Sequence, residues 1–448
     1  MSITIQAVGQ ASRRGATRRV PHAGVLLTAI DEWLVANATA VRGHALGART
    51  PDGAIELTLH PAARPVRIEA DDAGRVLARA MTIPVGPGYH TYVAGLLRRL
   101  GQDVGIAWTT ASPSGALHPE DPDASIDPTG AFFSGERSDA ERGHLVWLRS
   151  SLLAVRDARR QGASGLHLAT PLGVRYTFEG AVATVLGPRD DAWVEKALVD
   201  PRLASDIWPW GTDAMDARFH LGTALTLLWN DVRWRPPVGT PEVAVLDDVL
   251  STLRFAYPLD PDLPWPWAAW REAFQLRGLN DPATYQLLER FARDEANAAG
   301  AGRSAAAGSG AIPVGYRRNP VTILQGGWAI DLPGSFGDER SPDRWTGSDA
   351  GRTVTLAAAP TAIDGAPMSA EAFLAEYAAD LGADAIEHEA GPVRGRARIA
   401  SEAGTGIEIG RLDGYSGVRG SGAVVRIEFE DPADWKWAID TWRTVRPL

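Results

Sequence analysis

Seven of the sixteen tryptophans in this chain lie in one stretch, from Asp206 to Phe274. A tryptophan side chain buries a large apolar area and carries one N–H that needs a hydrogen-bond partner. A cluster of this kind therefore marks a packed junction between segments or a surface for a partner, and the rest of the chain must fold around it. The seven residues are Trp208, Trp210, Trp229, Trp234, Trp265, Trp267 and Trp270.

Two Trp-Pro-Trp motifs in this stretch interrupt the helical pattern with proline. They are Trp208-Pro209-Trp210 and Trp265-Pro266-Trp267. Because proline fixes its own backbone angle, these rings are predicted to wedge between domains. Tryptophan and arginine also dominate protein-binding hot spots. Two interpretations follow: the stretch is the seam between a first domain and a set of helices, or it contacts a partner. The residues proposed to contact a partner are Trp208, Trp210, Trp265, Arg233 and Arg235.

The size and charge of the chain limit its class. At 448 residues it exceeds one compact core, which predicts two or three domains. No apolar run approaches the roughly 18 residues that a membrane span needs, so no transmembrane helix is expected. The net charge of −10 opposes binding to nucleic acid. The absence of cysteine excludes disulfides and cysteine metal sites and favours a cytoplasmic protein.

Residues 1–185 are predicted to form one α+β domain with a mainly antiparallel sheet. Alternating apolar residues predict strands at Ile3–Ile5, Ile55–Leu59, Val66–Ile68 and Leu77–Ile83. The clearest helix runs from Tyr89 to Leu100, with Gly101 as its expected end.

Residues 186–297 show helical periodicity and are predicted to form a Trp-rich helical segment packed on the first domain. Residues 298–312 are almost all Ala, Gly and Ser, a composition typical of a flexible linker. This linker is the strongest domain boundary that the sequence indicates.

Residues 313–448 are predicted to form a second α+β domain. It opens with the strand Trp328–Leu332, has a helix capped by Ser369, and ends with a helix that places Trp435, Ile439 and Trp442 on one face. The segments 327–333, 368–374 and 425–442 resemble the PsbP/Mog1-like fold, a small antiparallel sheet between helices. This resemblance implies a non-enzymatic binding module, because proteins of that fold serve as photosystem accessory subunits, nuclear-transport factors and chaperones of secreted toxins.

The most site-like motif is Gly86-Pro87-Gly88-Tyr89-His90, between a predicted strand and a predicted helix. Backbone N–H groups at such a helix start can hold an anion, and His90 can donate beside them. The motif lacks the third glycine of a dinucleotide fingerprint, so a tight turn with a capping histidine is the competing interpretation. The candidate ligand-binding residues are Gly86, Gly88, Tyr89 and His90.

Other catalytic signatures are missing from the sequence. The acidic loop around Asp121, Asp123 and Asp127 fails the EF-hand pattern, because Ile126 and Phe132 replace its glycine and glutamate. No histidine pair has zinc-binding spacing, and no phosphate loop or serine-hydrolase elbow occurs. We therefore predict no metal, no cofactor and no catalytic residue.

The preferred hypothesis is a non-enzymatic bacterial protein-interaction factor, such as a chaperone, immunity or accessory protein of a toxin or secretion system. A bacterial source is favoured because arginine almost completely replaces lysine, as in GC-rich genomes; the lysines are Lys196 and Lys436. The alternative is an enzyme with its pocket near Gly86–His90 and the loop at residues 110–137.

Overall fold

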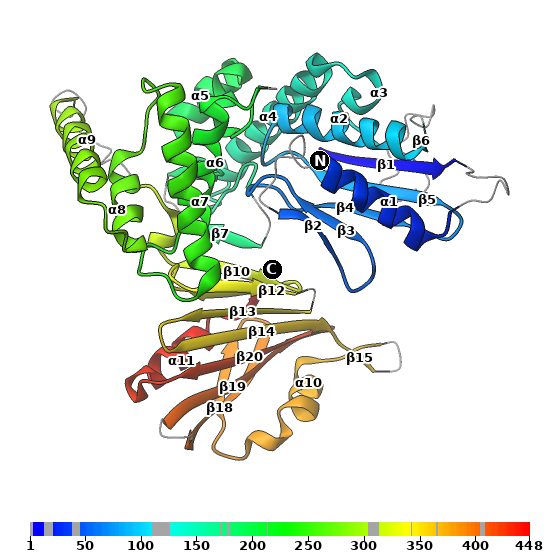
Figure 1. Cartoon of the computed structure of the whole chain (residues 1–448). Coiled ribbons are helices and arrows are strands. Elements are labelled where there is room, and N and C mark those ends of the chain that lie inside the picture. The colour runs from blue at the N-terminus through cyan, green and yellow to red at the C-terminus, as the bar shows by residue number, and fades with distance from the viewer. Residues whose placement is uncertain are drawn as a thin grey trace.

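A computed structural model of the whole chain shows an α+β protein built from mostly antiparallel sheets and many helices (Figure 1). The predicted fold class is therefore confirmed. The structure describes residues 3–12, 21–37, 45–109, 126–170, 173–176, 180–212, 214–302, 313–341, 343–363, 366–403 and 408–448.

The first part of the chain forms a six-stranded antiparallel sheet whose apolar face is covered by two helices. Its strands alternate between buried apolar residues and a polar outer face that carries Gln6, Arg67 and Arg79. In sheet order the strands are β2 (Ala45–Arg49), β3 (Ile55–Thr58), β4 (Val66–Ala70), β5 (Arg75–Met81), β1 (Thr4–Ala11) and β6 (Ile106–Trp108), and the helices are α1 (Ala23–Ala36) and α2 (Pro87–Val104).

Helix α2 ends one turn later than its sequence predicts. The C-cap is Gly105, in the left-handed conformation at φ 80°, and not Gly101. Gly101 is needed for close packing instead, because the indole Nε1–H of Trp108 donates to the Leu97 carbonyl across this turn at 2.8 Å. A packing glycine and a stop glycine look alike in a sequence.

The middle of the chain is mainly helical, as its periodicity predicts (Figure 1). A first group packs beside α2, and a second group forms a separate apolar core. The first group is α3 (Ala131–Ser134), α4 (Arg137–Arg160), α5 (Asp191–Val199) and the short 3-10 helix η1 (Pro201–Ile207). The second group is α6 (Ala217–Asn230), α7 (Thr240–Ala256), α8 (Trp267–Arg277) and α9 (Pro282–Gly302). A hairpin of β8 (Ala181–Thr184) and β9 (Gly187–Asp190) precedes α5.

The last part of the chain forms a seven-stranded antiparallel sheet between two helices. Phe373 of α10 (Ala370–Tyr377) contacts Gly417 and Gly422, while Trp442 of α11 (Trp435–Trp442) contacts Gly395 and Gly414, which face the other side. In sheet order the strands are β12 (Gly337–Arg340), β13 (Arg344–Asp349), β14 (Arg352–Pro360), β20 (Ser421–Phe429), β19 (Glu408–Val418), β18 (Val393–Ala403) and β17 (Ile386–Ala390).

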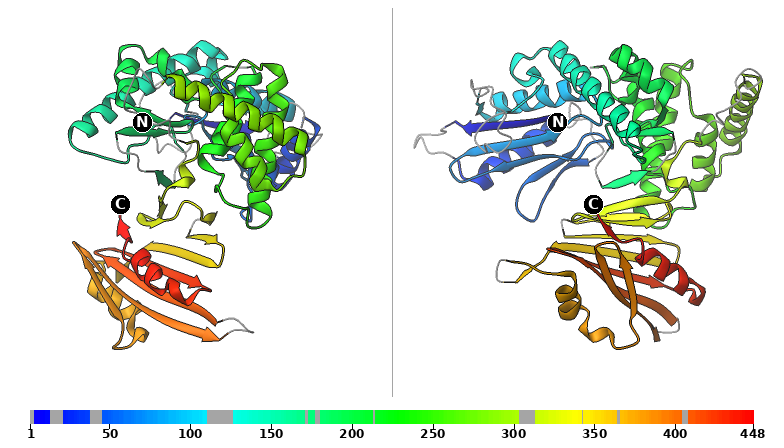
Figure 2. Two further views of the ribbon diagram at one scale, coloured as in Figure 1. Left: turned by 90° about the vertical axis from the view of Figure 1, so that its left-hand side faces the viewer. Right: turned by 180° about the vertical axis from the view of Figure 1, so that it is seen from behind.

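A four-stranded sheet joins the middle of the chain to its C-terminal part, and side and rear views show it between the seven-stranded sheet and the rest of the molecule (Figure 2). Strand β7 (Val174–Tyr176) pairs with β10 (Val321–Gln325), which pairs with β11 (Trp328–Leu332) and then β21 (Arg446–Pro447). Residues before the predicted boundary at 185 thus share a sheet with residues after 313. Strand pairing between segments this far apart leaves no pattern among neighbouring residues in the sequence, so it cannot be predicted from periodicity.

Residues 298–302 of the predicted linker continue helix α9 to Gly302, so the helical segment extends past its predicted end at 297. Residues 303–312 lie outside the described part of the chain. Among the described residues, none of the helices combines the length and hydrophobicity that a membrane span requires.

Candidate functional site

The predicted ligand motif lies at the start of α2, and the structure buries it. Gly86 is the N-cap with φ 113°, and the Gly88 N–H donates to the Trp210 carbonyl at 3.1 Å. A Cβ on Gly86 would lie 2.6 Å from the Cβ of Trp208, and Tyr89 is fully buried. The two glycines therefore let the Trp208–Trp210 segment lie against the helix. The ligand-site prediction is corrected: this motif is a packing contact.

His90 is also inaccessible, with its side chain fully buried among hydrogen-bond partners. Its Nδ1 lies 2.9 Å from the Thr82 hydroxyl, and its Nε2 lies 3.0 Å from the Thr129 hydroxyl and 3.3 Å from a carboxylate oxygen of Asp127. Burial raises the pKa of Asp127, but hydrogen bonds from His90 and two backbone N–H groups outweigh it and lower the pKa to about 2. This network fixes the residues at 127–132 onto α2.

His144 of α4 packs against this network and gives the fold a predicted sensitivity to acid. Burial, and after it the neighbouring His90, lower the pKa of His144 to about 3. The folded state therefore binds fewer protons than the unfolded state between about pH 3 and 6.5, and stability falls as pH drops through this range. We expect a loss of about 2 kcal/mol between pH 8 and pH 5 from this group.

Urea midpoints at pH 8 and pH 5 measure this effect, and His144→Gln is the comparison. Between pH 8 and pH 5, the free energy of unfolding of the variant should fall by about 2 kcal/mol less than that of the wild type. An unchanged pH dependence in His144→Gln would show that His144 does not titrate in this way.

The tryptophans proposed to contact a partner are buried too. Trp208 is 5% exposed, Trp210 1% and Trp265 3%. Trp210 packs on Tyr92 and Phe219, with ring centroids 5.0 and 4.6 Å away. Trp208 and Trp210 hold the helices to the first sheet, and Trp265 lies in the core of the helices. The partner prediction for these three residues is corrected, because prolines that break a helix pattern do not by themselves expose a ring.

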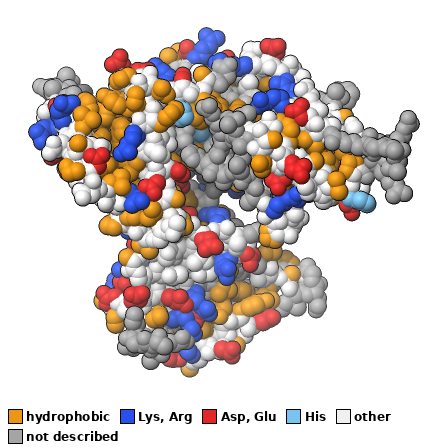
Figure 3. Space-filling view, viewed as in Figure 1, with side chains coloured by type: hydrophobic (Ala, Val, Ile, Leu, Met, Phe, Trp, Pro, Cys, Tyr) orange, Lys and Arg blue, Asp and Glu red, His pale blue; other side chains and the backbone are white. Residues whose placement is uncertain are grey.

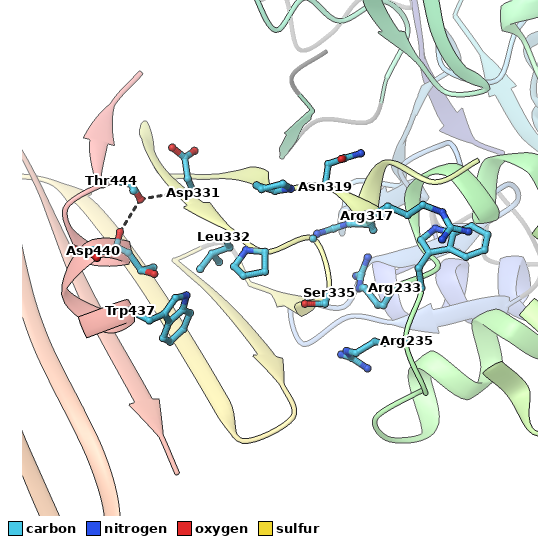
Figure 4. A pocket seen from close by; sticks show the side chains of 16 residues that line it. Arg233, Arg235, Arg317, Asn319, Asp331, Leu332, Ser335, Trp437, Asp440 and Thr444 are labelled. Carbon is cyan, nitrogen blue, oxygen red and sulfur yellow. Dashed lines mark hydrogen bonds between the residues drawn. The ribbon is translucent and has the colours of Figure 1, made fainter. Parts of the chain in front are cut away.

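The described surface has a cleft between the loop after α6, the end of β11 and helix α11, with a volume of about 600 Å³. In the close-up, Arg233, Arg235 and Arg317 lie on one side, and Trp437, Asp440 and Thr444 lie on the other (Figure 4). We call it the Trp–Arg cleft; it is lined by residues 233–235, 317–320, 331–335, 437, 440, 441 and 444.

Loops and helix ends from three regions build this cleft. Arg233–Arg235 follow α6, and residues 317–318 end the 3-10 helix η4 (Tyr316–Arg318). Residues 333–335 follow β11, and Trp437 belongs to α11. Trp234 adopts a positive φ of 57°, which turns its ring beneath the Arg318 guanidinium at 3.7 Å. This arrangement exists only when three segments that lie far apart in the sequence are folded together.

The arginines of the cleft are already paired with carboxylates. Arg235 donates to both oxygens of Glu242, at 2.6 and 2.9 Å, and Arg318 binds Glu272 in the same way. Arg317 donates to Asp338 at 2.6 Å, and Arg233 lies 3.4 Å from the same carboxylate. The side chain of Arg233 is 9% exposed and that of Arg235 15%. These two arginines join internal segments and also line the cleft, so their contact with a partner stays a prediction.

The electrostatics of the cleft also argue against a strong anion site. Burial raises the pKa of Asp231 behind the arginine wall to about 6, which still leaves this carboxylate mostly ionised at neutral pH. The cleft leaves open to a partner the half-buried Trp234 and Trp437, the prolines Pro320 and Pro333, and the exposed Asn319. Its accessible charged side chains, Arg318, Asp331 and Asp440, are each paired with an oppositely charged side chain of this chain. Such a surface suits an extended peptide segment.

Sequence reasoning missed Arg317, Arg318 and Trp437. Periodicity predicts Trp435 on the inner face of the last helix, but Trp435 is 53% exposed and Trp437 lines the cleft. Trp435 is the first residue of α11. Within the described ranges, no three His, Asp or Glu side chains converge to hold a metal ion. Residues 110–125, which include Asp121 and Asp123 of the acidic loop, lie outside the described part.

Comparison with known proteins adds little. No family model matches the sequence, and no curated protein matches it. A crystal structure at 1.50 Å from Bacteroides thetaiotaomicron VPI-5482 matches 29% of this chain at 9% identity, with a TM-score of 0.25. The match spans about half of that chain, 49% of its length. A likeness this distant carries no argument about function.

Proposed function

We propose that this chain is a non-enzymatic protein-interaction factor that holds an extended, largely uncharged segment of a partner protein in the Trp–Arg cleft. The observation that carries the proposal is the open cleft of about 600 Å³ with two half-buried tryptophans, Trp234 and Trp437, in its walls. This volume lies within the roughly 300–1,000 Å³ of ligand-binding clefts. Half-buried tryptophans are the side chains that most often anchor a partner.

The proposal also includes a cellular role. It acts in the bacterial cytoplasm as a chaperone, immunity or accessory protein of a toxin or secretion system, and nucleic acid is not its partner. The C-terminal part serves as a PsbP/Mog1-like binding module. The antiparallel sheet with α10 and α11 on opposite faces supports that assignment.

Trp437→Ala tests the proposal directly, because the ring lies in the cleft wall, where its inner side stacks on the buried Phe336. A tagged wild-type chain purified from its native host should bring down a stoichiometric partner. Removing a tryptophan anchor costs about 2 to 4 kcal/mol of binding free energy, so the variant should bind that partner at least about 30-fold more weakly in calorimetry.

Trp435→Ala is the matched control, since Trp435 lies on the same helix, is 53% exposed and does not line the cleft. It should retain the wild-type affinity. An eluate without a partner, or a partner held equally well by Trp437→Ala, would refute the proposal. Overlapping peptides from the captured partner should then identify one uncharged segment that competes for binding.

A further inference from the structure

A second, smaller pocket lies where the first sheet meets the helices, away from the Trp–Arg cleft. It has a volume of about 350 Å³ and is lined by Leu59 and His60 after β3, by Phe219, His220 and Thr223 of α6, and by Phe255 of α7, among others. Pockets at the junction of two structural units are a common location for small-molecule sites. Hydrophobic side chains are widespread on the helical side of the molecule (Figure 3).

Four of the ten residues that line this pocket carry aromatic rings. Phe219 and His220 lie edge to face, with centroids 4.9 Å apart, and His220 and Phe255 repeat this arrangement at 4.9 Å. His60 lies 6.1 Å from Phe219. Aromatic rings attract a further ring through edge-to-face or offset stacking. Phe255 is 58% exposed, so its ring gains apolar contact only if something covers it.

The polar end of the pocket is neutral. The Ala62 N–H donates to His60 Nδ1 at 3.1 Å, so Nδ1 carries no proton. The proton is then on Nε2, which donates to the Thr223 hydroxyl at 3.2 Å, and that hydroxyl donates to the Phe219 carbonyl at 3.0 Å. His60 is 1% exposed and Thr223 4%. This hydrogen-bond relay fixes His60 as an uncharged ring.

No charged side chain completes the lining. None of the residues that line this pocket, all of them in the described part of the chain, is Asp, Glu, Lys or Arg. The titratable side chains of the lining are the two histidines, His60 and His220, so a charged ligand would lose its hydration here without gaining a permanent counter-charge. From the ring geometry, the neutral relay and the absence of charge, we infer that this pocket binds a small, uncharged, planar aromatic molecule that stacks on Phe255.

Equilibrium dialysis of the full chain with indole tests this inference, with indole-3-acetate as the charged probe and cyclohexanol as the neutral, non-aromatic probe. Indole should bind saturably at one site, and the other two probes should bind at least tenfold more weakly. Phe255→Ser should weaken indole binding at least tenfold, while Phe255→Trp should stay within about threefold of the wild type.

Two controls separate this site from other surfaces. Leu259→Ser removes an apolar side chain that is 55% exposed near Phe255 but outside the pocket, and it should leave indole binding unchanged. Trp437→Ala should also leave it unchanged, so a failure of the cleft proposal would not affect this test. Equal binding of indole and indole-3-acetate, unchanged binding by Phe255→Ser, or no saturable binding would overturn the inference. Loss of a protein partner in Phe255→Ser without indole binding would assign the pocket to a partner's aromatic side chain instead.

Discussion

Gly88→Ala is expected to destabilise the protein by more than about 3 kcal/mol, because no space exists for a single methyl group at this position. A Cβ on Gly88 would overlap the backbone carbonyl oxygen of Thr212 and lie 2.6 Å from the Trp210 ring. The obstacle is backbone, which cannot rotate away as a flexible side chain can. Helix α2 would have to move away from the Trp208–Trp210 segment, opening the contact between the first sheet and the helices.

Gly95→Ala provides a control on the same helix. A Cβ there meets nothing within 4 Å, so the change should stabilise the protein by up to about 1 kcal/mol through helix propensity. Urea midpoints followed by tryptophan fluorescence and circular dichroism measure both variants. If Gly88→Ala folds with wild-type stability but changes the binding of an anion, the motif at residues 86–90 is a ligand site after all, and its assignment as a packing contact is wrong.

Arg317→Met is expected to cost about 3 to 5 kcal/mol, the usual effect of removing one partner from a buried ion pair. Arg317 is 4% exposed and donates to Asp338 of β12 at 2.6 Å and to the Asn230 carbonyl at the end of α6 at 3.3 Å. It therefore joins the helices to the seven-stranded sheet. Without it, Asp338 keeps only the longer contact of 3.4 Å to Arg233.

Arg446→Met is the matched control, because Arg446 also binds a carboxylate with two nitrogens, that of Asp331 at 2.8 and 3.0 Å. That pair is 47% and 41% exposed, so its loss should cost at most about 1 kcal/mol. The double variant Arg317→Met, Asp338→Asn should recover part of the loss, since it removes the orphaned charge. Equal urea midpoints for Arg317→Met and Arg446→Met would contradict this account of the junction.

The local pattern of this sequence predicts its elements well. The alternating strands of the first sheet, the helical run from residue 190 onward and the strands and helices of the last 120 or so residues all follow from periodicity and capping. The helix capped by Ser369 is an example, since its hydroxyl accepts the N–H of Ala372 at 3.1 Å. These signals depend only on neighbours in the chain.

The candidate sites could not be predicted in the same way as the helices and strands, because each site prediction depended on whether the side chains are exposed to solvent. Gly86–His90 reads as a site only if it faces solvent, and Trp208 reads as an anchor only if no segment covers it. In the fold, each of these covers the other. Arg233 and Arg235 were predicted to contact a partner because arginine is common in binding hot spots. The carboxylates that neutralise them include Asp338 and Asp349, which lie about a hundred residues away in the sequence.

The sequence by itself determined the fold class and most of the helices and strands. Only the tertiary structure decided which segments cover the tryptophan-rich stretch and which residues line the cleft. It also decided that β7 shares a sheet with β10. The physical reason is the distance along the chain over which each interaction acts. Helix periodicity, capping and strand alternation are fixed within a few residues, whereas burial, ion pairing and strand pairing depend on which distant segments meet.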